Sequence, residues 1–216
     1  MVARAALQYV MPGEVLGVGT GSTVNRFIDA LEGVRSQVRG AVSSSEASAQ
    51  RLRALGIEVL DCNSVGQIPV YIDGADEIDP RGYMIKGGGA ALTREKIVAA
   101  QSDRFICIAD VSKLVDVLGG FAIPVEVIPM ATQRIVRQFA AIGGVARLRL
   151  RQDQPVVTEN GQHILDVSGM QIVDPPAFET TVNQWPGVIT VGVFAHQKAA
   201  LCLVGSDAGV RTVHYP

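Results

Sequence analysis

Short apolar runs alternate with helical patterns through the first half of the chain. Glu14–Val18 is one such run after a Pro-Gly turn, and Thr23–Leu31 follows with apolar residues at helical spacing. Further strands are predicted at 40–43, 57–60, 70–72 and 104–109, and helices at 46–55 and 91–100. Apolar strands alternating with helices are typical of a parallel sheet covered on both faces, which predicts an α/β domain.

A different order of elements begins at about Ile123. The patterns predict strand 123–128, helix 131–142, strands 147–151 and 162–167, helix 175–184 and strand 188–194. This β-α-β-β-α-β order is ferredoxin-like, and Asn160-Gly161 predicts a tight hairpin between its central strands. Two last strands, 200–204 and 211–214, are expected to return to the first sheet. The predicted domains are therefore 1–122 with 199–216, and 123–198.

The net charge and the composition of the chain argue against several classes of binding partner. The 216 residues include 19 basic and 21 acidic side chains, a formal net charge of −2. We therefore expect no nucleic-acid partner, because phosphate backbones attract basic surfaces. No run is apolar enough to span a membrane, and the first residues predict a helix, not a signal peptide. Three widely spaced cysteines predict neither disulfides nor a zinc site and favour a reducing cytoplasm.

The segment Gly17–Thr23 follows a strand and opens a helix, and ligands of open α/β sheets bind at such strand ends. Free N–H groups at a helix N-terminus attract anions, and the hydroxyls of Ser22 and Thr23 add donors. The spacing is neither a complete GxGxxG fingerprint nor a Walker A loop. Either the segment binds a phosphate, or it is a tight turn in which Ser22 or Thr23 caps the helix.

Asp73, Asp76 and Glu77 place three carboxylates within five residues after strand 70–72. Crowded carboxylates repel one another, so they serve a metal or a proton transfer, or they are simply solvated. A magnesium site would need more ligands, and neither a histidine nor a second acidic cluster is near in sequence. Ser43-Ser44-Ser45 precedes another helix and is most simply interpreted as a cap.

Lys86 leads the triple glycine Gly87-Gly88-Gly89 into a helix that carries Glu95. A glycine backbone can wrap a ligand, and the lysine can neutralise developing negative charge. Glu95 is either a general base or a carboxylate that stabilises the positive end of its helix. Lys113 either reaches the same edge of the sheet or is an ordinary surface lysine.

Together, these segments predict a pocket for a small phosphorylated sugar. They offer N–H groups and hydroxyls for a phosphate, carboxylates for a polyol, a lysine and a candidate base. No nicotinamide, flavin or nucleotide fingerprint is complete, so we predict proton-transfer chemistry without a cofactor.

Several long segments resemble the ribose-5-phosphate isomerase A family, and the resemblance spans nearly the whole chain. They are GVGTGSTV (17–24), SSSEAS (43–48), DGADEID (73–79), KGGGAALTREKIVA (86–99), PVEVIPMA (124–131), ILDVSGM (164–170) and PGVITVGVFA (186–195). The resemblance implies a Rossmann-like α/β domain with a mostly parallel sheet plus a smaller ferredoxin-like α+β domain. It also implies a cytoplasmic, metal-independent enzyme that forms a homodimer or homotetramer. We expect the smaller domain to build the subunit interface, because it carries no dense polar motif.

The implied reaction interconverts D-ribose 5-phosphate and D-ribulose 5-phosphate through a cis-enediolate, in the non-oxidative pentose phosphate pathway. Glu95 matches the family's general base, and Asp73, Asp76 and Lys86 match residues near the reacting end. The substrate-binding residues that the resemblance implies are Gly19, Thr20, Gly21, Ser22, Thr23, Gly74, Ala75, Gly87, Gly88, Gly89 and Lys113. Among these, Ser22, Thr23 and Lys113 match positions near the phosphate.

The N-terminal segment departs from the family pattern, in which a lysine ahead of the first helix often helps to hold the phosphate. Here Arg4 is the only basic residue before AALQYV. Either Arg4 or the N-terminal amine substitutes, or the start is truncated, or the contact is missing.

Two functions other than isomerisation each require features of their own. A sugar-phosphate sensor without catalytic activity would need a DNA-binding segment, and we expect no room for one before residue 14. Acyl-CoA transfer on a similar fold would need a catalytic glutamate in a different loop and a larger substrate surface.

Overall fold

The computed structural model describes residues 1–215, which form two compact units. Within the described residues, unit 1 comprises 1–75, 94–113 and 197–215, and unit 2 comprises 76–93 and 114–196. This division differs from the predicted domains, because residues 76–93 and 114–122 belong with the second unit and not with the first.

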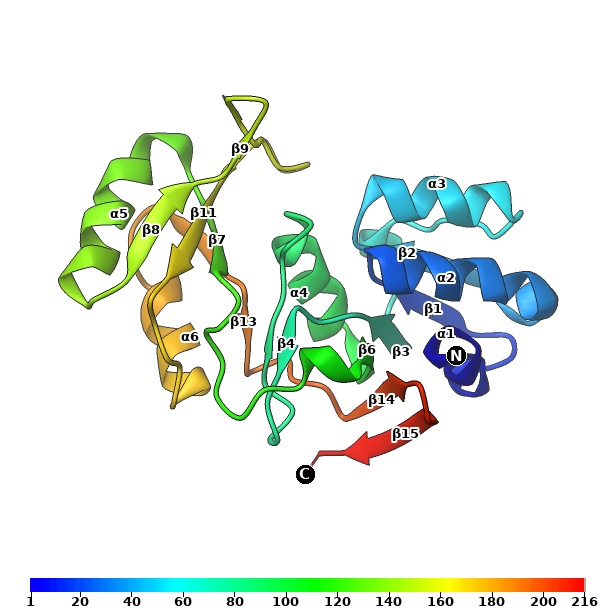
Figure 1. The fold of residues 1–216 in the computed structure, drawn as a ribbon. Coiled ribbons are helices and arrows are strands. Elements are labelled where there is room, and N and C mark those ends of the chain that lie inside the picture. The colour runs from blue at the N-terminus through cyan, green and yellow to red at the C-terminus, as the bar shows by residue number, and fades with distance from the viewer. Residues whose placement is uncertain (216) are drawn as a thin grey trace. The chain divides into compact units, whose positions relative to one another are not determined.

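Unit 1 is built on a six-stranded sheet with the order β15-β14-β6-β3-β1-β2 (Figure 1). Its strands are β1 (Val15–Val18), β2 (Gly40–Ser43), β3 (Ile68–Asp73), β6 (Ser102–Asp110), β14 (Leu201–Ser206) and β15 (Gly209–His214). All neighbours pair in parallel except β14 and β15, which form an antiparallel hairpin. The predictions of a mostly parallel sheet and of a return by the last two strands are confirmed.

The helices of unit 1 bury their apolar stripes on this sheet. They are α1 (Val2–Ala5), α2 (Ser22–Ala30), α3 (Glu46–Ala54) and most of α4 (Leu92–Ala100), with short 3-10 turns at Ala6–Tyr9, Leu31–Gln37, Cys62–Ser64 and Val111–Lys113. Phe27 and Ile28 of α2 and Leu52 of α3 are fully buried with Ile72 and Ile108 of the sheet. This core explains the helical spacing of the sequence.

The predicted strand at 57–60 is wrong. Only Val59 forms a bridge, to Ala41 at the edge of the sheet. Two backbone hydrogen bonds join this segment to Ala41, one donated by Leu60 N–H and one accepted by Glu58 O, whereas Ile57 N–H donates back to Leu52 O of α3. An apolar run becomes a strand only when a partner pairs along its length, and here the pairing ends after one residue.

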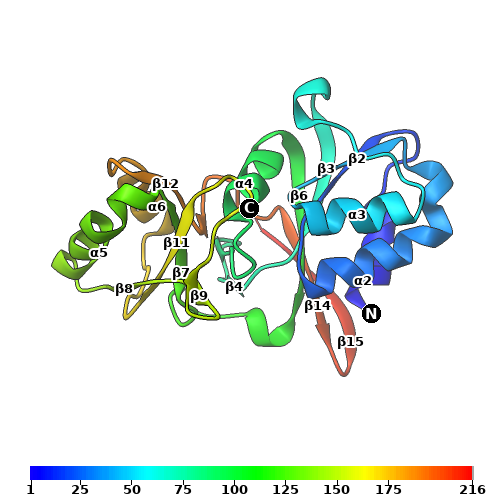
Figure 2. The same cartoon turned by 90° about the horizontal axis from the view of Figure 1, so that it is seen from above.

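Unit 2 contains a four-stranded antiparallel sheet with the order β12-β7-β11-β8. Its elements are β7 (Ile123–Val127), α5 (Thr132–Ala141), β8 (Val145–Leu148), β11 (His163–Ser168), α6 (Pro175–Asn183) and β12 (Val188–Val191), with a 3-10 turn at Pro129–Ala131. Helices α5 and α6 lie against this sheet (Figure 2). They contribute Phe139 and Val182 to a buried core that also contains Val125 and Leu165 of the sheet. The ferredoxin-like order is confirmed, as is the turn at Asn160-Gly161, where Gly161 has φ +77°.

Three short strands, at 77–78, 84–85 and 154–155, were not predicted, and the strands predicted at 147–151 and 188–194 are each divided in two. Residues Glu77–Ile78 (β4), Met84–Ile85 (β5) and Val193–Phe194 (β13) form an antiparallel sheet, and Leu150–Arg151 (β9) pairs with Gln154–Pro155 (β10). The strand predicted at 188–194 is therefore divided at Gly192, with β12 on β7 and β13 on β5. A Cβ atom at Gly192 would lie 2.3 Å from the Lys86 carbonyl oxygen, so only glycine allows this crossing.

Candidate active site

Asp73 is the last residue of β3, and its side chain is fully buried in unit 1. Its Oδ1 accepts hydrogen bonds from the N–H groups of Thr20 (3.1 Å) and Gly74 (2.7 Å), and Oδ2 accepts one from the Tyr71 hydroxyl (2.5 Å). These donors replace the water that a buried carboxylate loses. The carboxylate is therefore held in one position at the carboxyl end of the sheet.

The loop after β1 lies directly against this carboxylate. Gly19 N–H donates to Ile72 O at 2.9 Å, which brings the loop alongside the end of β3. A Cβ atom at position 19 would lie 1.9 Å from Asp73 Cγ and 2.0 Å from its Oδ1. Glycine at this position is what permits the backbone to approach the carboxylate so closely.

Tyr71 connects Asp73 with Glu95 inside unit 1. Burial raises the pKa of the Tyr71 phenol well above its usual value, and the negative charges of Asp73 and Glu95 raise it further, while the Ser44 hydroxyl lowers it. Tyr71 therefore stays protonated and donates to Asp73. Glu95 itself is 4% exposed and lies in the first turn of α4. Tyr71 was not among the predicted site residues, although residues 71 and 73 of a strand must share one face.

The start of α2 matches the requirements of an anion site. Gly21 is its N-cap residue with φ +107° and ψ 174°, and within residues 1–215 no side chain caps this helix. The interpretation of Ser22 or Thr23 as the cap is therefore wrong, and the first N–H groups of α2 remain available. The Ser45 hydroxyl, by contrast, accepts from Ser48 N–H at 3.1 Å, which confirms the cap interpretation for α3.

Thr20 and Lys113 are two further predicted residues that lie in unit 1. The Ser45 hydroxyl donates to Thr20 Oγ1 at 2.9 Å, which ties the loop after β1 to the start of α3. Lys113 ends the 3-10 turn after β6 and is half-buried. The pKa of Asp110 is lowered by hydrogen bonds from Ser112 and, to a smaller extent, by the charge of Lys113 nearby.

Asp76 and Lys86 belong to unit 2, where the sheet β13-β5-β4 fixes their backbones. Asp76 N–H donates to Ile85 O at 2.8 Å, and Lys86 N–H donates to Gly192 O at 2.8 Å. The Asp76 carboxylate accepts from Gly88 N–H at 2.8 Å. The Lys86 side chain is 2% exposed, and its Nζ lies 5.5 Å from the centre of the Phe194 ring. A buried ammonium over an aromatic ring is favourable, so the Lys86 side chain is positioned as well.

Glu126 of β7 is a buried carboxylate that the sequence analysis did not single out. It is fully buried and accepts from the Thr158 hydroxyl at 2.6 Å, from Asn160 Nδ2 at 3.2 Å and from the Thr93 hydroxyl. Thr93 lies in the first turn of α4, so these contacts tie the start of that helix to the 158–162 hairpin. Nothing in the local pattern indicates them, because the partners are distant in sequence.

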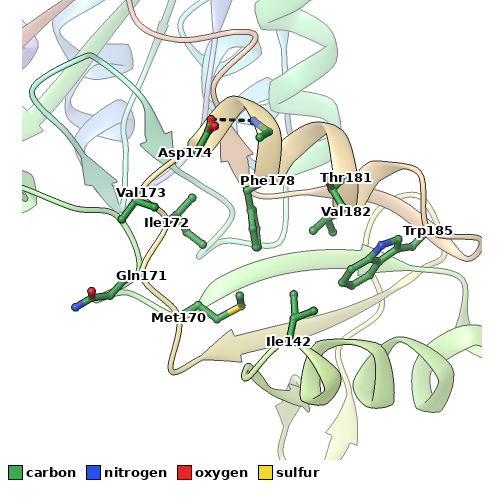
Figure 3. Close-up of a pocket in the computed structure, with 11 residues that line it drawn as sticks. Ile142, Met170, Gln171, Ile172, Val173, Asp174, Phe178, Thr181, Val182 and Trp185 are labelled. Atoms are coloured by element: carbon green, nitrogen blue, oxygen red, sulfur yellow. Dashed lines mark hydrogen bonds between the residues drawn. The ribbon is translucent and has the colours of Figure 1, made fainter.

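An apolar cavity of about 300 Å³ lies in unit 2, between α6 and residues 170–174. Figure 3 shows Phe178 and Val182 of α6 facing Met170 and Ile142 across it. Asp174 at its margin caps α6, since its Oδ1 accepts from Ala177 N–H at 3.2 Å. The cavity therefore offers a surface for apolar contacts, and its one carboxylate is engaged with the helix.

Residues 1–215 show neither a metal-binding cluster nor a membrane-spanning helix. In that part of the chain, no group of three or more His, Cys, Asp or Glu side chains is placed to hold a metal ion. In the same part, no helix has the length and apolar character of a membrane span.

Comparisons with known proteins show the family of this chain. The family model "Ribose 5-phosphate isomerase A (phosphoriboisomerase A)" matches residues 40–209. A relative from Albidiferax ferrireducens with the name ribose-5-phosphate isomerase A is 66% identical, over 100% of this chain and 92% of its own length. The chain belongs to the ribose-5-phosphate isomerase A family. A second such isomerase, from Polaromonas, is 65% identical over 99% of this chain and 90% of its own length.

Solved structures of ribose-5-phosphate isomerases share the whole fold. That of Neisseria gonorrhoeae has a TM-score of 0.95 at 40% identity and covers 100% of this chain and 95% of its own. A D-ribose-5-phosphate isomerase in complex with phospho-erythronic acid has a TM-score of 0.94 at 37% identity, over 99% and 96% of the chains. The protein is therefore an enzyme, a ribose-5-phosphate isomerase, and not a sensor without catalytic activity.

Proposed function

We propose that this isomerase interconverts D-ribose 5-phosphate and D-ribulose 5-phosphate through a cis-enediolate, with Glu95 as general base. The observation that supports Glu95 most is its burial in the first turn of α4, close to the hydrogen-bonded pair of Tyr71 and Asp73. A carboxylate shielded from water can hold an abstracted proton until it is returned to the same substrate.

Each of the four predicted catalytic residues has a role in this scheme. Asp73, Asp76 and Lys86 assist opening of the furanose ring. Glu95 then takes the proton from C2 and returns it to C1, while Asp73 assists transfer of the O2 hydroxyl proton to O1. Lys86 and backbone N–H groups stabilise the negative charge of the enediolate, and one such donor contributes about 3–4 kcal/mol in other enzymes.

The phosphate is proposed to bind at the N-terminus of α2, with Ser22, Thr23 and Lys113. The absence of a side-chain cap on this helix within residues 1–215 supports the assignment, because its first N–H groups and its dipole both attract an anion. The backbone N–H of Gly21 needs no reorientation when substrate arrives. Gly19 and Thr20, whose own N–H groups donate to Ile72 O and to Asp73, are proposed to shape the loop around the phosphate. Gly74, Ala75, Gly87, Gly88 and Gly89 are proposed to line the sugar.

The isomerase solved with phospho-erythronic acid provides a probe for this scheme. The carboxylate of that acid is planar, like the oxygen-bearing carbons of a cis-enediolate, and the molecule also carries a phosphate. We expect the acid to bind to this protein and to compete with ribose 5-phosphate.

The experiment is formation of ribulose 5-phosphate by purified protein with EDTA present, comparing the native chain with Glu95→Gln. Glutamine keeps the size and hydrogen bonding of the side chain but cannot accept the proton. Turnover of the variant should fall by about 100-fold or more, while phospho-erythronic acid still binds. Near-native turnover by Glu95→Gln would remove Glu95 from its role, and loss of native turnover with EDTA would point to a required metal.

We infer further that the enzyme acts in the cytoplasm, in the non-oxidative pentose phosphate pathway, as a homodimer or homotetramer joined through unit 2. The apolar cavity and the exposure of Ile142 (49%) and Val173 (69%) beside it support an interface on this unit. Sedimentation of the native chain tests this assignment. A fully active monomer would refute it.

A further inference from the structure

Arg149 of unit 2 contacts the glycine loop, defined here as residues 87–89, from one side. Its Nη1 donates to the carbonyl oxygens of Gly87 and Gly88, both at 3.0 Å. Its Nε and Nη2 donate to the two carboxylate oxygens of Asp166 at 2.8 and 2.5 Å. One guanidinium therefore joins the loop to β11, which carries Asp166.

The arginine is itself held in place. Its backbone N–H donates to Ile164 O at 2.8 Å, and its side chain is only 15% exposed. A guanidinium held by both oxygens of a carboxylate has a fixed plane, so the direction of its remaining N–H groups is fixed too.

The contacts from Arg149 also determine where the backbone N–H groups of the glycine loop point. The described chain contains no cis peptide bond, and in a trans peptide the C=O and the N–H of the same plane point in opposite directions. Since Arg149 holds the carbonyls of Gly87 and Gly88, the N–H groups of Gly88 and Gly89 must point away from it. The Gly88 N–H does so, and donates to Asp76 Oδ2 at 2.8 Å.

We propose that Arg149, oriented by Asp166, is a positioning residue that directs the backbone N–H groups of Gly88 and Gly89 toward Asp76 and the substrate. The inference rests on the proposed function, in which this loop lies against the sugar. Three consecutive glycines have more accessible backbone conformations than any other tripeptide, and Gly88 and Gly89 are exposed. Without the contacts from Arg149 to the carbonyls of Gly87 and Gly88, the N–H groups of the loop would have to be ordered in each catalytic cycle.

A plain cross-strand ion pair is the alternative explanation of the Arg149–Asp166 contact. Arg147 offers a matched control, because it stands directly opposite Asp166 in the register of β8 and β11 and is exposed. An ion pair that only joined strands would not require Nη1 to contact two successive carbonyls of the glycine loop.

The test compares Arg149→Ala, Arg149→Lys and Asp166→Asn with the control Arg147→Ala. Lysine keeps the charge but cannot hold a carboxylate through two nitrogens and two carbonyls at once. We expect kcat to fall about 10- to 100-fold in Arg149→Ala, with KM changing less, and to fall less in Arg149→Lys and Asp166→Asn. Arg147→Ala should stay within about twofold of the native kcat, as expected for an exposed side chain.

Two readouts separate positioning from a general effect on folding. Amide hydrogen exchange of residues 87–90 should rise in the Arg149 variants under conditions where the rest of the chain stays protected. Added guanidinium should partly restore turnover to Arg149→Ala. Native kcat in Arg149→Ala and Arg149→Lys would overturn the proposal, and so would lost activity with unchanged loop exchange and no rescue.

Glu95→Gln distinguishes this proposal from the assignment of the base. Its loop exchange should equal that of the native protein, because the variant does not touch the contacts of Arg149. If Glu95→Gln keeps its turnover while Arg149→Ala loses it with faster loop exchange, the assignment of the base fails and that of Arg149 stands. If Arg149→Ala keeps its turnover while Glu95→Gln loses it, only the proposal for Arg149 is refuted.

Discussion

Substitution of Gly19 by alanine tests how the loop after β1 is fitted to Asp73. The new Cβ would lie 1.9 Å from Asp73 Cγ, whereas ordinary contacts begin at 3.4 Å, so the two groups must separate by about 1.5 Å. Displacement of the Asp73 side chain would be energetically costly, because it is fully buried and accepts hydrogen bonds from Thr20, Tyr71 and Gly74. The loop must move instead, which lengthens the bond from Thr20 N–H to the carboxylate.

The expected cost follows from these contacts. Overpacking of a well-packed site costs about 1–3 kcal/mol, and a weakened hydrogen bond to a buried charge adds about 1.5–3 kcal/mol. We therefore expect Gly19→Ala to lower the free energy of unfolding by about 3–6 kcal/mol, or the melting temperature by about 6–24 °C. A displacement of about 1 Å at the site should also reduce kcat/KM by about 100-fold.

The assays are urea unfolding and formation of ribulose 5-phosphate. Gly33→Ala is the matched control, because a Cβ atom at Gly33 has no neighbour within 4 Å. It should keep native activity and unfold at the same or a slightly higher urea concentration. If Gly19→Ala matched Gly33→Ala in both assays, the close approach of the loop to Asp73 would be refuted.

Two further predictions concern Tyr71 and Lys113. Burial and the charges of Asp73 and Glu95 raise the pKa of Tyr71, so the folded state favours the protonated phenol. The contribution of this phenol to stability is therefore complete below the usual tyrosine pKa of about 10. That contribution is lost as the pH rises above about 10. Tyr71→Phe should therefore show a smaller loss of urea stability above about pH 10 than the native chain, and an equal loss would refute the assignment. Lys113→Gln should raise KM for ribose 5-phosphate about three- to tenfold with little change in kcat, because a charge near the phosphate binds substrate and transition state alike. Steady-state kinetics measure both constants, and a native KM in this variant would exclude the contact between Lys113 and the phosphate.

Much of the fold was predictable because its signals are local. The strand 40–43 and the helix 46–55 were found nearly to the residue, since apolar spacing and the Ser45 cap lie within the segments themselves. The strand at 57–60 was not, because an apolar run says nothing about whether a partner strand extends beside it. The split of 188–194 at Gly192 was missed for the same reason, since it depends on pairing with the distant strand β5.

The candidate site shows the same division. Glycines, hydroxyls and carboxylates at strand ends indicated a phosphorylated sugar, because the types of residue that such chemistry needs are visible in sequence order. The roles of Tyr71, Glu126 and Arg149 were invisible, since each depends on partners outside its own segment. Their types, a tyrosine in a strand, a buried glutamate and a half-buried arginine, have no functional signature by themselves.

The sequence by itself determined the α/β class, the ferredoxin-like order, the residues at the strand ends and the chemistry that they suit. These properties follow from side-chain type and from spacing over a few residues, which the chain carries without folding. Only the tertiary structure decided that Gly19 approaches Asp73 closely, that Tyr71 remains protonated between two carboxylates, and that Arg149 holds the glycine loop. Such properties depend on distance and burial, which arise only when segments far apart in the sequence pack together.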